Sequence, residues 1–281
     1  MFLALAGCGA FHDSFFNAAG PIAGQERHLF IIVSIVMLFV IGPVLILTPI
    51  IAWHYRLSNT KHAYRPHWSF SWILEFFIWV PPTLIVIGLS FLLWNYTHKL
   101  DPYRPIESSQ PTLEVRAVSL DWKWLFIYPR QHVATVNMLA IPAGRPVHIE
   151  MTSGTVMQSL MIPQLAGQIY TMGGMTTQLH IQADHPGTYT GQNTQYNGEG
   201  FAKQKFAVNA LAPQQFDEWI AHVRATGKPF DAKAYHHLFE KSVEKQPILF
   251  SSAPDGLFQR ILDRYHPTAR ASDTNPEVIR P

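Results

Sequence analysis

The residue with the clearest claim to chemistry is Glu75, the only charged residue in a long apolar run, Trp72–Tyr96. A charged side chain is costly inside a membrane segment, so it is expected to face protein or water and to mark a path for protons or ions. If this run is a membrane helix entered near Trp72, Glu75 lies about one helical turn, roughly 5 Å, below the surface. The position predicts a group that collects protons. The alternative is a boundary residue whose carboxylate reaches back to water.

Cys8 is the only cysteine, so the chain can form no intrachain disulfide and no cysteine-based zinc or iron–sulfur site. It ends Leu5–Cys8, which matches the box at which a bacterial lipoprotein is cut and its new N-terminal cysteine is acylated. The seven residues before it hold no Lys or Arg and are shorter than a working signal peptide. Two interpretations stay open: lipidation of Cys8 with a start further upstream, or a small apolar residue.

Histidine and methionine could also ligate a metal, and the chain has 14 and 8 of them. Several histidines flank the apolar runs, and the neighbours His236 and His237 cannot easily face one site on a helix. The methionines that could suggest a copper-transport site are spread over two predicted strands and a loop: Met157, Met161, Met172 and Met175. We predict packing or surface roles for these side chains and no metal site.

The composition favours a protein of which one part avoids water. The 281 residues are 48% hydrophobic and only 14% charged, with a net charge of +2. No long basic block and no glycine-rich phosphate loop is present, which argues against nucleic-acid or nucleotide binding. The length suits one medium-sized domain plus membrane segments.

Two apolar runs, Leu29–Trp53 and Trp72–Tyr96, predict a two-helix transmembrane hairpin over 29–96. Each has 25 residues, or roughly 37 Å as a helix, which is enough to cross a hydrocarbon core of about 30 Å. The segment between them, 54–71, carries three basic residues and no acid, so the positive-inside rule places it in the cytoplasm. Residues 1–28 and everything after the second run then lie in the periplasm. The alternative, two buried helices of a soluble protein, fits poorly with their length and lack of charge.

The region after the second apolar run has the pattern of a β domain. A polar, proline-bearing linker covers 97–111, and short strand-like runs separated by turn residues follow over 112–210. The runs are Thr112–Ser119, Trp122–Tyr128, Val136–Ile141, Val147–Thr152, Met157–Ile162, Thr176–Ala183, Gly187–Gly191 and Phe206–Ala210. Their spacing predicts a β-sandwich or a small barrel, and the pattern alone does not choose between them.

A helical, aromatic-rich extension is predicted over 211–265. Pro213 suits the first turn of a helix, and the apolar residues after it recur at helical spacing: Phe216, Trp219, Ile220 and Val223. Similar patterns return over Tyr235–Val243 and Leu257–Tyr265. The tail 266–281 has no periodicity and is predicted to be disordered.

A set of short segments occurs in a fixed order from Cys8 to about Tyr265. They are Leu5–Cys8, the paired apolar runs, Asp121–Trp124, Phe126–Pro129, Ala134–Asn137, Ile162–Pro163, Gln168–Tyr170, Gly174–Met175 and Pro186–Tyr189. Each is weak alone. Together they make the chain similar to subunit II of the haem–copper respiratory oxidases, and within that family to the quinol branch, the cytochrome bo-type ubiquinol oxidases.

The loop after Pro186–Tyr189 carries the most specific part of this resemblance. In copper-bearing members it reads C-S-E-x-C-G-x-x-H-x-x-M and, with a histidine upstream, holds the two-copper electron-entry site called CuA. The resemblance places those ligand positions at Gln158, Asn193, Gln195, Asn197, Phe201 and Gln204. Of these, the Gln195 position ligates through its backbone carbonyl. Such copper needs thiolate, imidazole and thioether donors, so no metal is expected at this degenerate CuA site.

The resemblance also implies a fold and further site residues. The fold is a transmembrane helical hairpin, then a periplasmic cupredoxin-like Greek-key β-sandwich, then a short α-helical C-terminal extension. Glu75, in an E-x-x-x-W-x-x-P context with Trp79 and Pro82, would lie at the mouth of a proton channel. Alternating aromatics predict one strand face of core and rim side chains: Trp122, Trp124, Phe126 and Tyr128. Of these, Trp122 or Trp124 is expected to pack on subunit I.

The function implied is that of a non-redox subunit II of a proton-pumping ubiquinol oxidase in the bacterial inner membrane. Haems, CuB and the main quinol site would lie in subunit I, leaving this chain with no cofactor and no catalytic centre. Its partners would be subunit I, the other subunits, the lipid bilayer and, through the complex, ubiquinol, but not cytochrome c. The alternatives are a membrane-anchored cupredoxin for electron transfer or copper delivery, and a cytochrome c oxidase subunit II with CuA. Both require ligands that the loop lacks.

Overall fold

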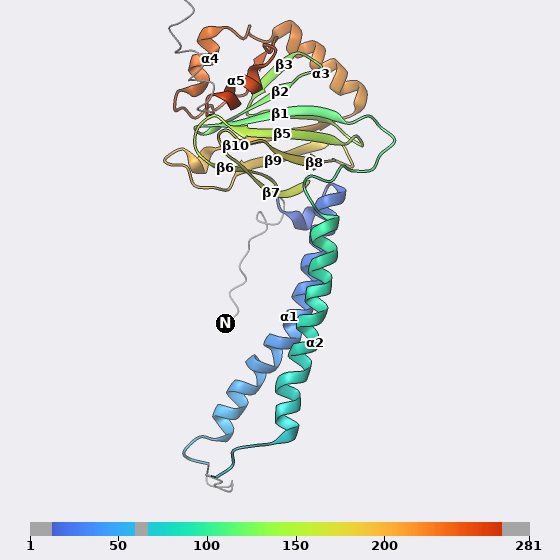
Figure 1. The fold of residues 1–281 in the computed structure, drawn as a ribbon, viewed down its shortest axis with the longest axis vertical. Coiled ribbons are helices and arrows are strands. Elements are labelled where there is room, and N and C mark those ends of the chain that lie inside the picture. Colours follow the sequence, from blue (N-terminus) through green and yellow to red (C-terminus); the bar gives the residue numbers. More distant parts are fainter. Residues whose placement is uncertain (1–12, 60–66, 266–281) are drawn as a thin grey trace, which may run out of the picture. The chain divides into compact units, whose positions relative to one another are not determined.

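The computed structural model describes residues 13–59 and 67–265, so Cys8, part of the predicted cytoplasmic loop and the tail 266–281 lie outside the described residues. The described residues divide into two compact units, one spanning Arg27–Asp101 and the other made of the rest. Figure 1 draws the long helices of the first unit and the strands and short helices of the second.

Two long helices, α1 (Pro21–His54) and α2 (Trp72–Lys99), are long and apolar enough to cross a membrane. α1 begins upstream of the predicted Leu29, and α2 ends beyond the predicted Tyr96. Each helix holds two prolines in its interior, which membrane helices tolerate better than soluble ones.

The chain just before and within the first turn of α1 belongs to the β unit. After a 3-10 turn, η1 (Phe15–Asn17), the Ala19 N–H donates to the Gln164 carbonyl at 2.8 Å, and the Asp184 N–H donates to the Ala19 carbonyl at 2.8 Å. Gly20 lies so close that a Cβ there would be 2.1 Å from the Gln182 carbonyl oxygen. Because this docking uses backbone groups, the hydropathy pattern does not reveal it.

The β unit is a sandwich of two sheets, which is one of the two architectures that the strand pattern left open. The first sheet has the order β11-β3-β2-β1-β5-β8, and the second has the order β4-β10-β9-β6-β7. The first consists of β1 (Leu113–Leu120), β2 (Lys123–Tyr128), β3 (Val133–Val136), β5 (Val147–Ser153), β8 (Thr177–Ile181) and β11 (Ile248–Phe250). The second consists of β4 (Met138–Pro142), β6 (Gln158–Ile162), β7 (Ala166–Thr171), β9 (Gly187–Asn193) and β10 (Lys205–Leu211).

An aromatic cluster fills the space between the sheets. Trp124, Phe126 and Tyr128 have no exposed surface, and the Phe206 ring centroid lies 5.9 Å from that of Trp124 and 5.0 Å from that of Phe126. Trp122 does not continue this face, because it lies in the turn before β2 with φ 66°. The predicted alternation is therefore right from Trp124 onward and wrong for Trp122.

The single strand predicted over 136–141 is two strands, and Asn137 is the reason. β3 belongs to the first sheet and β4 to the second, so the chain crosses between the sheets at this residue. Asn137 has φ 57°, a left-handed conformation that asparagine tolerates. Its N–H donates to the Trp124 carbonyl at 2.9 Å, and its Oδ1 accepts the Trp124 N–H at 2.9 Å. Two further strands that were not predicted are the edge strand β7 and the three-residue β11.

The C-terminal extension contains α3 (Pro213–Thr226), α4 (Ala232–Phe239) and α5 (Leu257–Asp263). In Figure 1, α4 and α5 lie above the sheet of β1, β2 and β3, and α3 lies beside β3, in contact with strands of both sheets. α3 contributes apolar side chains to the core between the sheets. The rest of the extension joins the outward side chains of β1–β3 in a second cluster: Val118, Leu120, Leu125, Ile127, Leu238, Phe250, Leu257, Phe258 and Ile261. This second cluster explains why every residue of β2 is buried.

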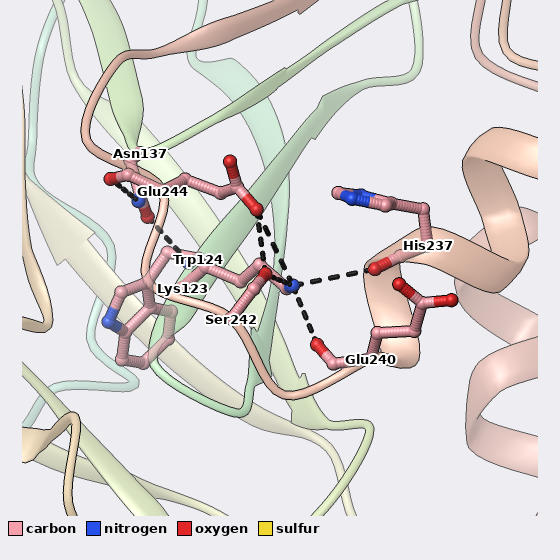
Figure 2. Close-up of polar contacts among 7 residues, drawn as sticks. All are labelled: Lys123, Trp124, Asn137, His237, Glu240, Ser242 and Glu244. Carbon is pink, nitrogen blue, oxygen red and sulfur yellow. Dashed lines mark hydrogen bonds and ion pairs between the residues drawn. The ribbon is translucent and has the colours of Figure 1, made fainter.

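A buried lysine ties the extension to the sandwich (Figure 2). Lys123 in β2 is 1% exposed, and its Nζ donates to the Glu240 carbonyl at 2.8 Å and to the Ser242 hydroxyl. The His237 carbonyl lies 3.4 Å from Nζ, and the Glu244 carboxylate lies 4.0 Å away. Burial lowers the pKa of the Lys123 ammonium, and the nearby carboxylates oppose that effect. Because a buried cation is tolerated only when it is paired, these oxygens fix segment 237–244 against β2.

Replacing the lysine tests this clamp. Lys123→Met keeps the apolar stem but leaves the Glu240 carbonyl and the Ser242 hydroxyl without their donor, which should destabilise the extension by about 2–4 kcal/mol. The measurement is the rate of proteolytic cleavage within 240–247 and the thermal midpoint of the detergent-purified protein. Lys245→Met, at the exposed position directly after this segment, is the control and should change neither when the protease used does not cut at lysine. Equal cleavage rates for the two variants would contradict the clamp.

Candidate functional site: a buried amide network

The loop that the sequence singled out joins β9 to β10 and includes a 3-10 turn, η2 (Phe201–Lys203). β6 pairs with the end of β9, which brings Gln158 to the loop. Two glycines are sterically required. A Cβ on Gly191 would lie 2.1 Å from the Phe206 ring, and one on Gly200 would lie 2.2 Å from the Trp122 ring.

Gln204 is the centre of a network of buried side-chain amides. Its Nε2 donates to Gln158 Oε1 at 2.5 Å, and its Oε1 accepts from Asn193 Nδ2 at 3.0 Å and from Asn197 Nδ2 at 2.8 Å. Gln158, Asn193 and Gln204 are each at most 4% exposed. Four of the six positions that the sequence analysis singled out are therefore brought together by direct hydrogen bonds.

Asn193 connects this network to the backbone of two strands. Its Oδ1 accepts the Ser159 N–H at 3.0 Å and the Gln195 N–H at 3.0 Å. Its Nδ2 also donates to the Gln195 carbonyl at 2.8 Å. Gln195 thus takes part through its backbone only.

Phe201 accepts the Gln204 N–H through its carbonyl at 3.1 Å, but of the six described positions it is the one that makes no hydrogen bond to a side chain of the network. Its ring is half-buried and meets the exposed ring of Tyr196 edge-on, with centroids 5.6 Å apart. It closes one side of the loop by apolar contact and leaves the amides to pair among themselves.

The turn between β1 and β2 closes the other side of the network. The Leu120 carbonyl accepts from Gln158 Nε2 at 3.0 Å and from Gln204 Nε2 at 3.3 Å. The Trp122 indole N–H donates to the Asn197 carbonyl at 3.2 Å. The amides are therefore held by the loop, by β6 and by this turn at once.

This arrangement supplies hydrogen-bonded amides and no soft donor. Within the described part of the chain, Asn197 Oδ1 is the network oxygen that is buried without a hydrogen-bond partner. Copper of the CuA type prefers thiolate, imidazole and thioether ligands, which these side chains do not provide. No group of three or more His, Cys, Asp or Glu that could hold a metal occurs among residues 13–59 and 67–265. The network can fill space and rigidify the loop.

Comparison with known proteins identifies the family. The model of the periplasmic domain of cytochrome c oxidase subunit II matches residues 128–211, and that of the COX aromatic-rich motif matches 224–268. A cytochrome bo(3) ubiquinol oxidase subunit 2 from Pseudomonas putida is 40% identical over 276 residues, 98% of this chain and 87% of the relative. The chain belongs to the quinol oxidase subunit 2 family.

Two further relatives and one solved structure are also similar to this chain. The subunit 2 of Pseudomonas aeruginosa is 42% identical over 94% of this chain and 78% of its own length. The ubiquinol oxidase subunit 2 of Acetobacter aceti is 39% identical over 94% of this chain and 85% of its own length. A crystal structure of the periplasmic domain of cytochrome oxidase subunit II from Bradyrhizobium japonicum has a TM-score of 0.40 and 16% identity. It covers 42% of this chain and 96% of that one.

The expected packing of Trp122 or Trp124 on subunit I needs a correction. Trp124 is fully buried within the sandwich, so it has no surface for another subunit and the prediction is wrong for it. Trp122 is half-buried over Gly200 and keeps some exposed surface. For Trp122 the packing stays a prediction.

Glu75, the other predicted site residue of this quinol oxidase subunit 2 chain, belongs to the helical unit. It is half-buried near the start of α2, and the Trp79 indole N–H donates to its Oε2 at 2.9 Å.

Two residues that hold the amide network and its surroundings in place were not predicted from the sequence: Lys123 and Asn137. Lys123 could have been found from the sequence, because it is a charged residue between two tryptophans in a segment predicted to be a strand.

Two sandwich histidines have visible structural partners. His148 Nδ1 lies 2.7 Å from Glu114 Oε2, and His180 Nδ1 lies 3.0 Å from the Pro102 carbonyl. The two rings stack with centroids 4.6 Å apart. Neither occupies a position of the amide network.

The central amide can be tested by an isosteric change. Gln204→Met retains volume but removes the donor to Gln158 and the acceptor of Asn197, so it should destabilise the sandwich by about 2–4 kcal/mol. Urea unfolding of the purified protein, followed by tryptophan fluorescence, measures this loss. Gln192→Met, on the neighbouring half-buried position of β9, is the matched control and should cost less than about 1 kcal/mol. A loss no larger at Gln204 than at Gln192 would rule out an integral role for the network.

Proposed function

We propose that this chain is the non-redox subunit II of a proton-pumping ubiquinol oxidase. The observation that carries the proposal is the amide network, which occupies the positions that hold CuA in copper-bearing members. Electrons from cytochrome c would need a metal relay at this place, and amides supply none. A quinol donor in the membrane needs no such relay, and the relatives described above are named ubiquinol oxidase subunits.

In this proposal the haems, CuB and the main quinol site belong to subunit I, and this chain supplies support and a docking surface. The hairpin of α1 and α2 anchors it in the inner membrane, with the sandwich in the periplasm. Large apolar side chains next to the amide network are exposed and would suit a subunit contact: Val156, Met157 and Tyr196. The half-buried Trp122 would lie in the same contact.

An assay of the purified complex tests the proposal. The complex should reduce oxygen with ubiquinol as donor and should not oxidise reduced cytochrome c. Its spectrum should show haem bands without the near-infrared band of CuA. Two results would contradict the proposal and favour the cupredoxin alternative. The first is purification of the chain without a large multi-helix haem subunit, and the second is a near-infrared copper band that co-purifies with the chain.

Glu75 is the proposed entrance for protons taken up from the cytoplasm. It lies in the first turn of α2, next to the end that follows the basic cytoplasmic segment. A carboxylate in a membrane helix is retained where it faces protein or water, which is the condition for passing protons onward. This role is independent of the periplasmic amide network.

Removing the carboxylate tests this role. Glu75→Gln keeps the size of the side chain but cannot exchange a proton, so quinol-driven oxygen reduction should fall by at least about tenfold. Haem content and subunit composition should stay normal, since the substitution is isosteric. The measurement is oxygen consumption across a range of pH. Wild-type rates at every pH would refute the proton-entry role.

A further inference from the structure

The hydrogen bond between Trp79 and Glu75 carries a further inference. The two residues are one turn apart on α2, and the Nε1–Oε2 distance is 2.9 Å. Within the described residues, this is the one hydrogen bond made by the Glu75 side chain. Of the described residues, Trp79 is therefore the one that restrains the orientation of this carboxylate by a hydrogen bond.

Trp79 lies deeper along α2 than Glu75. α2 begins at Trp72, so Trp79 is four residues, or about 6 Å, further from the end of the helix at which the chain enters. A free glutamate near a membrane boundary would turn its carboxylate outward to water. The Trp79 indole N–H instead holds the Glu75 carboxylate against the helix in one orientation. The hydrogen bond thus restricts the free reorientation that a boundary residue would have, because helical side chains lean toward the N-terminus and the indole can reach back over the preceding turn.

The backbone beside this pair is also polar. Pro81 and Pro82 have no N–H, so the carbonyls of Phe77 and Ile78 lack their usual donors four residues on. The Thr83 hydroxyl donates to the Trp79 carbonyl at 2.7 Å. Acceptors and a hydroxyl therefore lie within one to two turns of the Glu75 carboxylate, on the deeper side.

Trp79 lies away from the face of α2 that α1 covers, and the half-buried Glu75 lies at the edge of that face. That face is marked by half-buried residues at helical spacing: Pro81, Ile85, Leu89, Leu92 and Tyr96. His28 Nδ1 of α1 lies 3.2 Å from the Tyr96 hydroxyl, which confirms the contact. At 100° per residue Trp79 lies about 120° from Ile85, and its side chain is 67% exposed.

We propose that Trp79 is a positioning residue for Glu75. Its indole N–H holds the carboxylate in one orientation at the side of α2, from which a proton received from the cytoplasm can be passed to the partner subunit. The inference rests on the proposed role of Glu75 as the proton entrance. It adds the residue that sets the geometry of that entrance.

The test compares four variants in the assembled oxidase. Trp79→Phe keeps an aromatic ring but loses the N–H, and it should lower quinol-driven oxygen reduction by about tenfold. Trp72→Phe, another exposed tryptophan of α2, is the matched control and should keep the wild-type rate. The Glu75→Gln/Trp79→Phe double variant should be no slower than Glu75→Gln alone, because both changes act on one step. Haem content verifies assembly, and Trp79→Leu, which also lacks a donor, replaces Trp79→Phe if assembly fails.

A spectroscopic measurement separates positioning from simple packing. The infrared carboxyl band that disappears in Glu75→Gln should shift in Trp79→Phe and stay unchanged in Trp72→Phe. If Glu75→Gln is slow while Trp79→Phe has the wild-type rate and an unshifted band, the positioning inference is overturned and the proton-entry role stands. If Glu75→Gln itself has the wild-type rate, the proton-entry role fails. The band shift alone then decides whether Trp79 holds the carboxylate.

Discussion

The turn between β1 and β2 is the feature on which the rest of the periplasmic unit depends. Its Leu120 carbonyl accepts two side-chain amides of the network, and its Trp122 indole covers Gly200 and binds the Asn197 carbonyl. At its end, the Lys123 ammonium holds segment 237–244 of the extension. A displacement of this turn would break the hydrogen bonds of the amides and of the lysine together. The loop between β9 and β10 and the C-terminal extension are therefore both held in place by this turn.

The constraint behind both contacts is the cost of leaving buried polar groups unpaired. A cation in β2 and a set of amides between strands would each destabilise the sandwich in isolation. The cation is balanced by carbonyls and a hydroxyl from the extension, and the amides are balanced chiefly by one another and by the Leu120 carbonyl. These hydrogen bonds also fix the orientation of the paired side chains, which apolar contacts alone do not do.

The sequence predicts the elements that show a periodic pattern within one segment. It does not predict the role of a single residue whose contacts are distant in the sequence. Apolar runs predict α1 and α2, and helical spacing after Pro213 predicts α3. The sequence gives no sign that Asn137 differs from its strand neighbours, and only the structure shows that the chain crosses from one sheet to the other at this residue. The expected contact of Trp124 with another subunit fails because periodicity groups residues on one strand face but does not tell whether that face lies between the sheets. The positions of the amide site could be predicted by resemblance, but their mutual pairing depends on rotamers and on strand register.

Mutual pairing gives a physical reason for the ligand positions to differ from copper-bearing relatives as a set. A cysteine returned at position 193 alone would leave the N–H groups of Ser159 and Gln195 without their acceptor, and Gln204 would lose one donor. It would also add a thiol with no metal to bind. A partly converted site is thus poorer than either a complete ligand set or a complete amide set. The surrounding frame, in which Gly191 lies against Phe206 and Gly200 against Trp122, constrains the backbone of the loop and not the chemistry of the side chains at these positions.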